Sequence, residues 1–148
     1  MIKATGYLLK WDRPTVCGVK FDSKIKVRIP NFVPVIDFAK PKPVGNFYYT
    51  EPPEHSEPIG MVISHDRDEH GIKVVMDIVC GNKEETLIEL MANKEVLCSG
   101  RYTINKLSEK NGITVADDIT LKSVDLYHAH DIFCPVDKDL ILEVKRND

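Results

Sequence analysis

The chain has 148 residues, enough for one domain that buries a hydrophobic core without disulfides or metals. Its 20 basic and 23 acidic side chains give a net charge of −3, so no basic excess is present to bind the phosphate backbone of a nucleic acid. Hydrophobic residues make up 43% of the chain, which is typical of a soluble globular protein and too high for a disordered one. Because no apolar run approaches the ~18 residues of a membrane helix and the first residues lack the pattern of a signal peptide, we expect no membrane partner.

The four cysteines lie far apart and form no C-x-x-C pair. Zinc sites and disulfide frameworks use characteristic close spacings, so we expect reduced thiols in an intracellular protein, with no metal and no cofactor. The cysteines are Cys17, Cys80, Cys98 and Cys134.

Short apolar runs separated by many prolines and glycines predict a mainly β chain of the α+β class. The segment 72–79 is the clearest strand, because apolar residues alternate there with Lys73 and Asp77. His70-Gly71 is a turn signal, which favours an antiparallel hairpin between 61–64 and 72–79. The predicted strands are 4–10, 25–29, 47–50, 58–64, 72–79, 96–105, 112–115, 119–127 and 140–144.

One segment, 83–93, has the period of a helix. Asn82 can cap its N-terminus, acidic residues in its first turn suit the positive end of the helix dipole, and Lys94 suits the negative end. Its apolar face consists of Leu87, Leu90 and Met91.

The proline-rich segment 29–50 predicts an ordered loop over a sheet, and one that could form a wall of a binding groove. Together these elements predict a single domain, 1–148, built as a partly closed antiparallel β-barrel with one or two short helices.

Two segments contain residues suited to nucleophilic catalysis. From residue type alone, a solvated loop histidine is the simpler interpretation of His55; against it, the prolines on both sides stiffen the backbone, as the positioning of a base requires. Ser99 follows the helix and needs such a base to attack a carbonyl, and Gly100 after it lets an oxyanion approach the main chain. Cys98 is an alternative nucleophile, but a lone cysteine in an apolar strand is more typical of an inert core thiol.

A carboxylate follows in the predicted strand 119–127. If that strand is regular, Asp125 shares a largely apolar face with Ile119, Leu121 and Ser123. A buried carboxylate there needs a donor such as an imidazole N–H, whereas at the edge of the face it would be solvated.

The segment His128-Ala129-His130 predicts two histidines on one strand face, a spacing found in some metal sites. The pattern fixes only two ligands, so a metal-dependent hydrolase using His128 and His130 remains an alternative. The polar segment 65–70 predicts a hairpin turn.

The order of these pieces resembles the prohead maturation proteases of tailed bacteriophages, which share a fold with the herpesvirus assemblins. The family opening, a strand with Gly-Tyr and a return to phenylalanine, is similar to 5–8 (TGYL) and 18–21 (GVKF) here. The family histidine shortly before a Pro-Ile-Gly-like strand matches His55, and the family serine after the helix matches Ser99. The third triad member matches Asp125, in a Val-Asp-Leu strand near the end of the domain.

The resemblance implies a protease-like domain acting as a serine endopeptidase through a Ser99–His55–Asp125 triad, with Gly100 supplying an oxyanion donor and Arg101 as a helper. Many family members have Glu-Val-Ser-Leu-Val where this chain has SVDLY, and assemblins use a second histidine, so His128 or His130 is an alternative third member. The implied substrates are the scaffold and major capsid proteins, inside an assembling prohead in the host cytoplasm. Assemblins work as dimers, which suggests a homodimer. A non-catalytic phage structural or assembly protein on the same scaffold is the competing hypothesis.

Overall fold

The computed structural model describes residues 1–15, 18–38, 58–79, 81, 84–130 and 136–145, which form eight strands and one helix. The expected strand 47–50 and the expected helix cap Asn82 lie outside these residues. The chain order is β1 (Ile2–Lys10), β2 (Val19–Arg28), β3 (Pro34–Phe38), β4 (Gly60–Arg67), β5 (Gly71–Ile78), α1 (Glu84–Ala92), β6 (Val96–Lys110), β7 (Ile113–His128) and β8 (Glu143–Val144). The mainly β prediction is confirmed.

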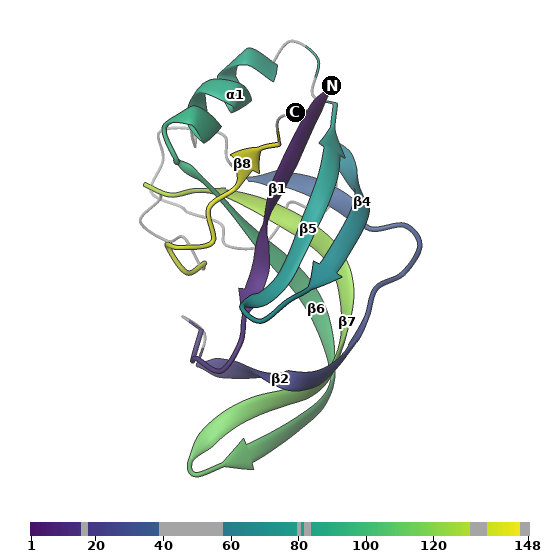
Figure 1. Cartoon of the computed structure of the whole chain (residues 1–148), viewed down its shortest axis with the longest axis vertical. Helices are drawn as coiled ribbons and strands as arrows, with labels where there is room; N and C mark the ends of the chain where they lie inside the picture. Colours follow the sequence, from purple (N-terminus) through teal and green to yellow (C-terminus); the bar gives the residue numbers. More distant parts are fainter. Residues whose placement is uncertain (16–17, 39–57, 80, 82–83, 131–135, 146–148) are drawn as a thin grey trace, which may run out of the picture.

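All eight strands belong to one mixed sheet. β4, β5 and β1 lie side by side as antiparallel neighbours, and β3 joins β4 to the long β7 (Figure 1). The predicted antiparallel pairing holds for the other strand pairs, but β2 and β3 both pair with β7 in the parallel sense, so the sheet is mixed. The hairpin predicted between β4 and β5 is confirmed.

The sheet does not close into a barrel, so the expectation of a partly closed barrel is matched only loosely. The C-terminal segment lies between the two ends of the sheet instead. β8 pairs with β1, and the segment 140–142 makes two backbone hydrogen bonds to β6. Of the predicted strand 140–144, only residues 143 and 144 form a regular strand. Beyond the segment 140–142, towards the C-terminal end of β1, the edges of β1 and β6 are not paired with each other.

Gly6 allows this close approach. A Cβ at Gly6 would lie 2.7 Å from the Cys98 Sγ and 3.1 Å from the Ile141 carbonyl oxygen. Because these contacts are shorter than van der Waals distances, only glycine lets β1, β6 and the C-terminal segment meet here.

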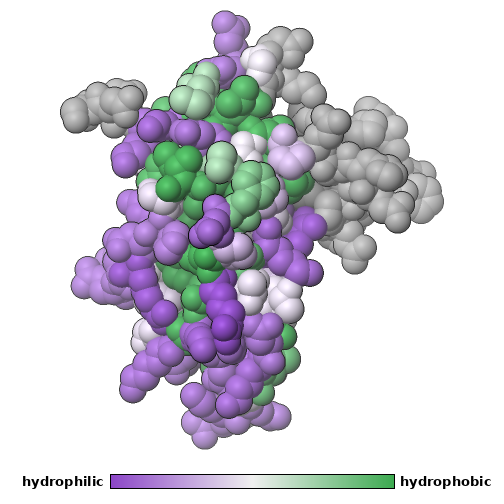
Figure 2. All heavy atoms as spheres, turned by 90° about the vertical axis from the view of Figure 1, so that its right-hand side faces the viewer, coloured by the Kyte–Doolittle hydropathy of each residue, from purple (hydrophilic) through white to green (hydrophobic). Residues whose placement is uncertain are grey.

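The long β6–β7 hairpin extends beyond the rest of the sheet, and its tip is hydrophilic (Figures 1 and 2). Asn111 and Gly112 form the turn with φ values of 54° and 79°, which suits the type I′ turn preferred by two-residue hairpins. Apart from Gly112 in the turn, the expected separate strands 112–115 and 119–127 are parts of the single strand β7.

α1 covers one end of the core and has the predicted apolar face. Leu87 and Met91 are buried, and Leu90 packs partly buried against the core. Lys94 adopts a left-handed φ of 57° just after the helix, where its N–H bonds to the Met91 carbonyl and the Glu95 N–H bonds to the Leu90 carbonyl. This pattern satisfies the last carbonyls and ends the helix.

The proline-rich segment holds a strand that the sequence did not predict. Pro34 is the first residue of β3, the position where its missing N–H removes no essential ladder bond. Within the described residues, no helix is long and apolar enough to span a membrane.

Candidate active site

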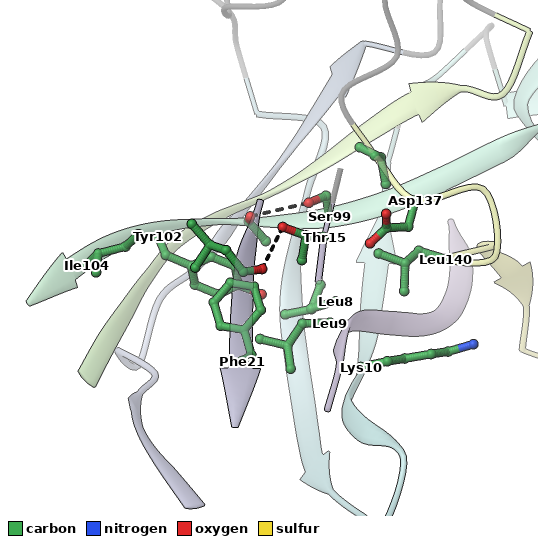
Figure 3. Close-up of a pocket in the computed structure, with 13 residues that line it drawn as sticks. Leu8, Leu9, Lys10, Thr15, Phe21, Ser99, Tyr102, Ile104, Asp137 and Leu140 are labelled. Carbon is green, nitrogen blue, oxygen red and sulfur yellow. Dashed lines mark hydrogen bonds between the residues drawn. The ribbon is translucent and has the colours of Figure 1, made fainter. Parts of the chain in front are cut away.

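Ser99 lies on β6 at the wall of a pocket of about 150 Å³ (Figure 3). The pocket is walled by the end of β1, the start of β2, β6 and the segment 136–140, and so occupies the gap where the sheet is not closed. The Ser99 Oγ makes one long contact of 3.4 Å, to the Gly100 carbonyl oxygen. This hydroxyl is therefore held only weakly by the described residues.

The backbone of Gly100 faces the same gap. Alternate residues of an antiparallel strand direct their N–H and C=O groups to opposite edges. Val96 and Cys98 bond to the C-terminal segment through their C=O and N–H respectively, so both face away from β7. Gly100 is two residues after Cys98, and the β6–β7 register is regular up to Arg101. The Gly100 N–H therefore faces away from β7 as well. Among the described residues, no backbone partner meets the Gly100 N–H there.

Asp125 is directly opposite Ser99 in the β6–β7 ladder and is 3% exposed. Arg101 donates two hydrogen bonds to the Asp125 Oδ2, at 3.0 Å from Nε and 2.6 Å from Nη2, and the Ser123 hydroxyl donates to Oδ1 at 2.9 Å. Burial raises the pKa of the Asp125 carboxyl, while the hydrogen bonds from Arg101 and Ser123 oppose that shift. Arg101, expected to assist at the oxyanion, thus contacts the carboxylate.

A β-bulge corrects the predicted face of Asp125. Arg101 pairs with Ser123 but the next residue, Tyr102, pairs with Leu121, so β7 carries one extra residue at this point. Leu121 therefore faces the main core together with Val124, and Asp125 faces the opposite side. The expectation that Ile119, Leu121, Ser123 and Asp125 share a face is wrong.

His128 pairs with Val96, three positions along β6 from Ser99, and His128 and His130 do not share a strand face as predicted. β7 ends at His128, and the His130 backbone N–H donates to the His128 Nδ1 in the turn that follows. The Nε2 atoms of His128 and His130 lie 3.8 and 3.5 Å from the two carboxylate oxygens of Glu95. In the described part of the chain, no group of three histidine, cysteine or acidic residues could hold a metal ion.

Cys98 is not a candidate nucleophile. Its thiol is fully buried and donates to the Tyr7 carbonyl oxygen at 3.2 Å. Burial raises the pKa of Cys98 to about 12, so the reactive thiolate is not formed near neutral pH. The interpretation of Cys98 as a core thiol is confirmed.

The predicted base, His55, lies outside the described residues, so its relation to Ser99 stays a prediction. Of the polar segment 65–70, predicted as a hairpin turn, residues 65–67 belong to β4 and only 68–70 form the turn. Asp68 accepts hydrogen bonds from the Tyr7 hydroxyl at 2.6 Å and from the backbone N–H groups of His70 and Gly71.

Asp139 joins the C-terminal wall of the pocket to the end of β1, through Lys10 and a bidentate contact with Arg13. The hydrogen bond from Arg13 lowers the pKa of Asp139 to about 2, so this link stabilises the fold above the ordinary carboxyl pKa and is lost as the pH falls towards 2. We expect Asp139→Asn to lower the Tm at pH 6, and expect that difference to shrink between about pH 4 and 2. Thermal unfolding across this pH range measures it; a difference independent of pH would contradict it.

The sequence did not predict that Leu8, Leu9, Phe21, Tyr102 and Leu140 would meet around Ser99. The apolar character of these residues predicts burial. No local signal shows that β1, β2, β6 and the segment 136–140, which are distant in sequence, share one pocket. A scan against known protein families gives no match for the chain, and a search of curated proteins gives none either.

Proposed function

We propose that the chain is a serine endopeptidase that cleaves scaffold and major capsid proteins during phage prohead maturation. The observation that carries the proposal is the position of Ser99 in a pocket at the outer edge of β6, next to the outward-facing N–H of Gly100. A nucleophile beside a backbone donor is the minimum arrangement for acyl transfer. The resemblance of the sequence to the prohead proteases supports the same reaction.

The mechanism assigns one step to each group. The Ser99 Oγ attacks the scissile carbonyl carbon while His55 takes its proton, and the Gly100 N–H donates to the oxyanion that forms. His55 then gives the proton to the leaving amine, and water hydrolyses the acyl-enzyme by the same steps. Asp125 is favoured over His128 as the third member, because it lies opposite Ser99 and on the same face of the ladder.

A serine-directed organofluorophosphonate tests this proposal, because such reagents label serines activated by a neighbouring base. We expect the intact chain to react with one equivalent and mass spectrometry to locate the label on Ser99. Boiled protein, in which the site is unfolded, is the control. Labelling that is absent from the folded protein, or spread over other serines, would contradict the proposal.

A non-catalytic assembly protein is the second candidate, and the bonding of Asp125 favours it. Both oxygens of this carboxylate already accept hydrogen bonds, from Arg101 and from Ser123, so the group is stable without an imidazole partner. This candidate predicts an unreactive Ser99 in a folded protein that still binds scaffold or capsid protein.

A further inference from the structure

We propose that the pocket beside Ser99 is a specificity pocket for one apolar side chain, of leucine to phenylalanine size, on the substrate residue next to the cleaved bond. This inference rests on the proposed function and adds the class of substrate.

The walls of the pocket are mainly apolar and belong to well-packed elements. Leu8 and Leu9 are each 2% exposed at the end of β1, Phe21 is 6% exposed on β2, and Leu140 is 4% exposed in the C-terminal segment. Side chains fixed in this way keep the pocket open without a ligand, as is typical of preformed binding sites (Figure 3).

The size of the pocket selects the side chain. Cavities of about 150 Å³ lined by leucine, isoleucine and phenylalanine accept a benzene-sized ligand. The pocket of this chain has that volume and a mainly apolar lining, with Lys10, Thr15, Ser99 and Asp137 as its polar side chains, so one aromatic ring or branched aliphatic group fits its size.

The charges at the pocket disfavour an ionic side chain. Lys10 is already ion-paired with Asp139, with 3.0 Å between Nζ and Oδ2, so an acidic side chain in the pocket would compete with Asp139 for it. Any charged side chain entering the pocket would also lose hydration, whereas an apolar side chain gains from leaving water.

The polar groups at the pocket suit the backbone of an extended peptide. The Gly100 N–H and C=O face the gap, where a peptide can pair with the edge of β6.

The full chain carrying Ser99→Ala, labelled at its leucine methyls, tests the inference by NMR titration with the N-acetyl amides of leucine, phenylalanine, alanine and aspartate. We expect the leucine and phenylalanine amides to bind about tenfold or more tightly than the other two, since they bury more apolar surface. We also expect them to shift the methyl signals of Leu8, Leu9 and Leu140.

Two tryptophan variants locate the binding. Ile104 is 40% exposed at the pocket, so Ile104→Trp covers its mouth at little expense to folding; Leu107 is 52% exposed on the same strand and does not line the pocket. We expect Ile104→Trp to weaken the leucine amide by about tenfold and Leu107→Trp to leave it unchanged. Equal binding of all four amides, or equal effects of the two variants, overturns the inference.

The result is independent of catalysis, because the Ser99→Ala protein lacks the nucleophile. Selective binding at the pocket together with an inactive wild-type protein contradicts the proposed protease function alone. Cleavage by the wild type with no preference among the amides contradicts the specificity pocket alone.

Discussion

Ser99→Ala is expected to lower the rate of scaffold or capsid cleavage by about 10⁴-fold or more, because the members of a catalytic triad act as a unit. The fold should tolerate the change. The Ser99 hydroxyl makes one long contact of 3.4 Å, so its loss should change the free energy of unfolding by no more than about 0.5 kcal/mol. Initial rates on purified scaffold protein, with Tm values for both proteins, measure the two effects separately.

Ser108→Ala is the matched control for Ser99→Ala. Ser108 lies on the same strand, outside the pocket, and its buried Oγ has no hydrogen-bond partner among the described residues. This variant should cleave at the wild-type rate. Wild-type cleavage by Ser99→Ala would remove Ser99 from the mechanism, and a comparable loss in Ser108→Ala would show that the effect is not specific to the site.

Local patterns predicted the elements that depend on a few neighbouring residues. The β4–β5 hairpin follows from alternation and from the turn at His70-Gly71, and both lie within one short stretch of sequence. The β6–β7 hairpin carries an equally local signal in Asn111-Gly112, the pair preferred in two-residue turns, which predicts a hairpin between the predicted strands 96–105 and 112–115. β3 was not predicted from the segment 29–50, because prolines disfavour strands except at the first residue of a strand, where Pro34 lies.

The site depends on pairings that no single segment encodes. The side of β7 on which Asp125 lies is set by the bulge between Leu121 and Ser123, and this bulge exists only in the register with β6. The pocket likewise exists because β1 and β6 do not pair with each other beyond the point where the segment 140–142 bonds to β6. Sequence analysis could therefore select Ser99 and Asp125 by residue type, whereas the structure supplies their shared ladder position and the contact of Asp125 with Arg101.

The ion pair between Arg101 and Asp125 leads to the second large effect, on stability. Arg101→Met removes the cation beside Asp125, whose side chain taken alone is 5% exposed, and so leaves a buried carboxylate unpaired. We expect a loss of about 2–3 kcal/mol at neutral pH, below the ~3–5 of a fully buried pair, because the Arg101 side chain is 35% exposed. Urea unfolding measures this loss.

The stability deficit of Arg101→Met is expected to depend on pH through the Asp125 carboxyl. Burial already raises the pKa of the Asp125 carboxyl, and removing Arg101 raises it further because its opposing hydrogen bonds are lost. A carboxyl whose pKa is higher in the folded state destabilises the fold as the pH rises through the interval between its unfolded and folded pKa values. The deficit of Arg101→Met should therefore be largest at neutral pH and shrink as the pH falls through that interval.

Two further variants separate a stranded charge from lost packing. Adding Asp125→Asn to Arg101→Met should recover part of the stability at neutral pH, because the neutral amide keeps a hydrogen-bond acceptor for Ser123. Arg28→Met is the matched control, since Arg28 is 55% exposed and meets Asp118 at 3.4 Å, and such surface pairs contribute at most about 1 kcal/mol. A deficit in Arg101→Met that is independent of pH and unrelieved by Asp125→Asn would mean that the aliphatic part of Arg101, and not its charge, stabilises this side of the sheet.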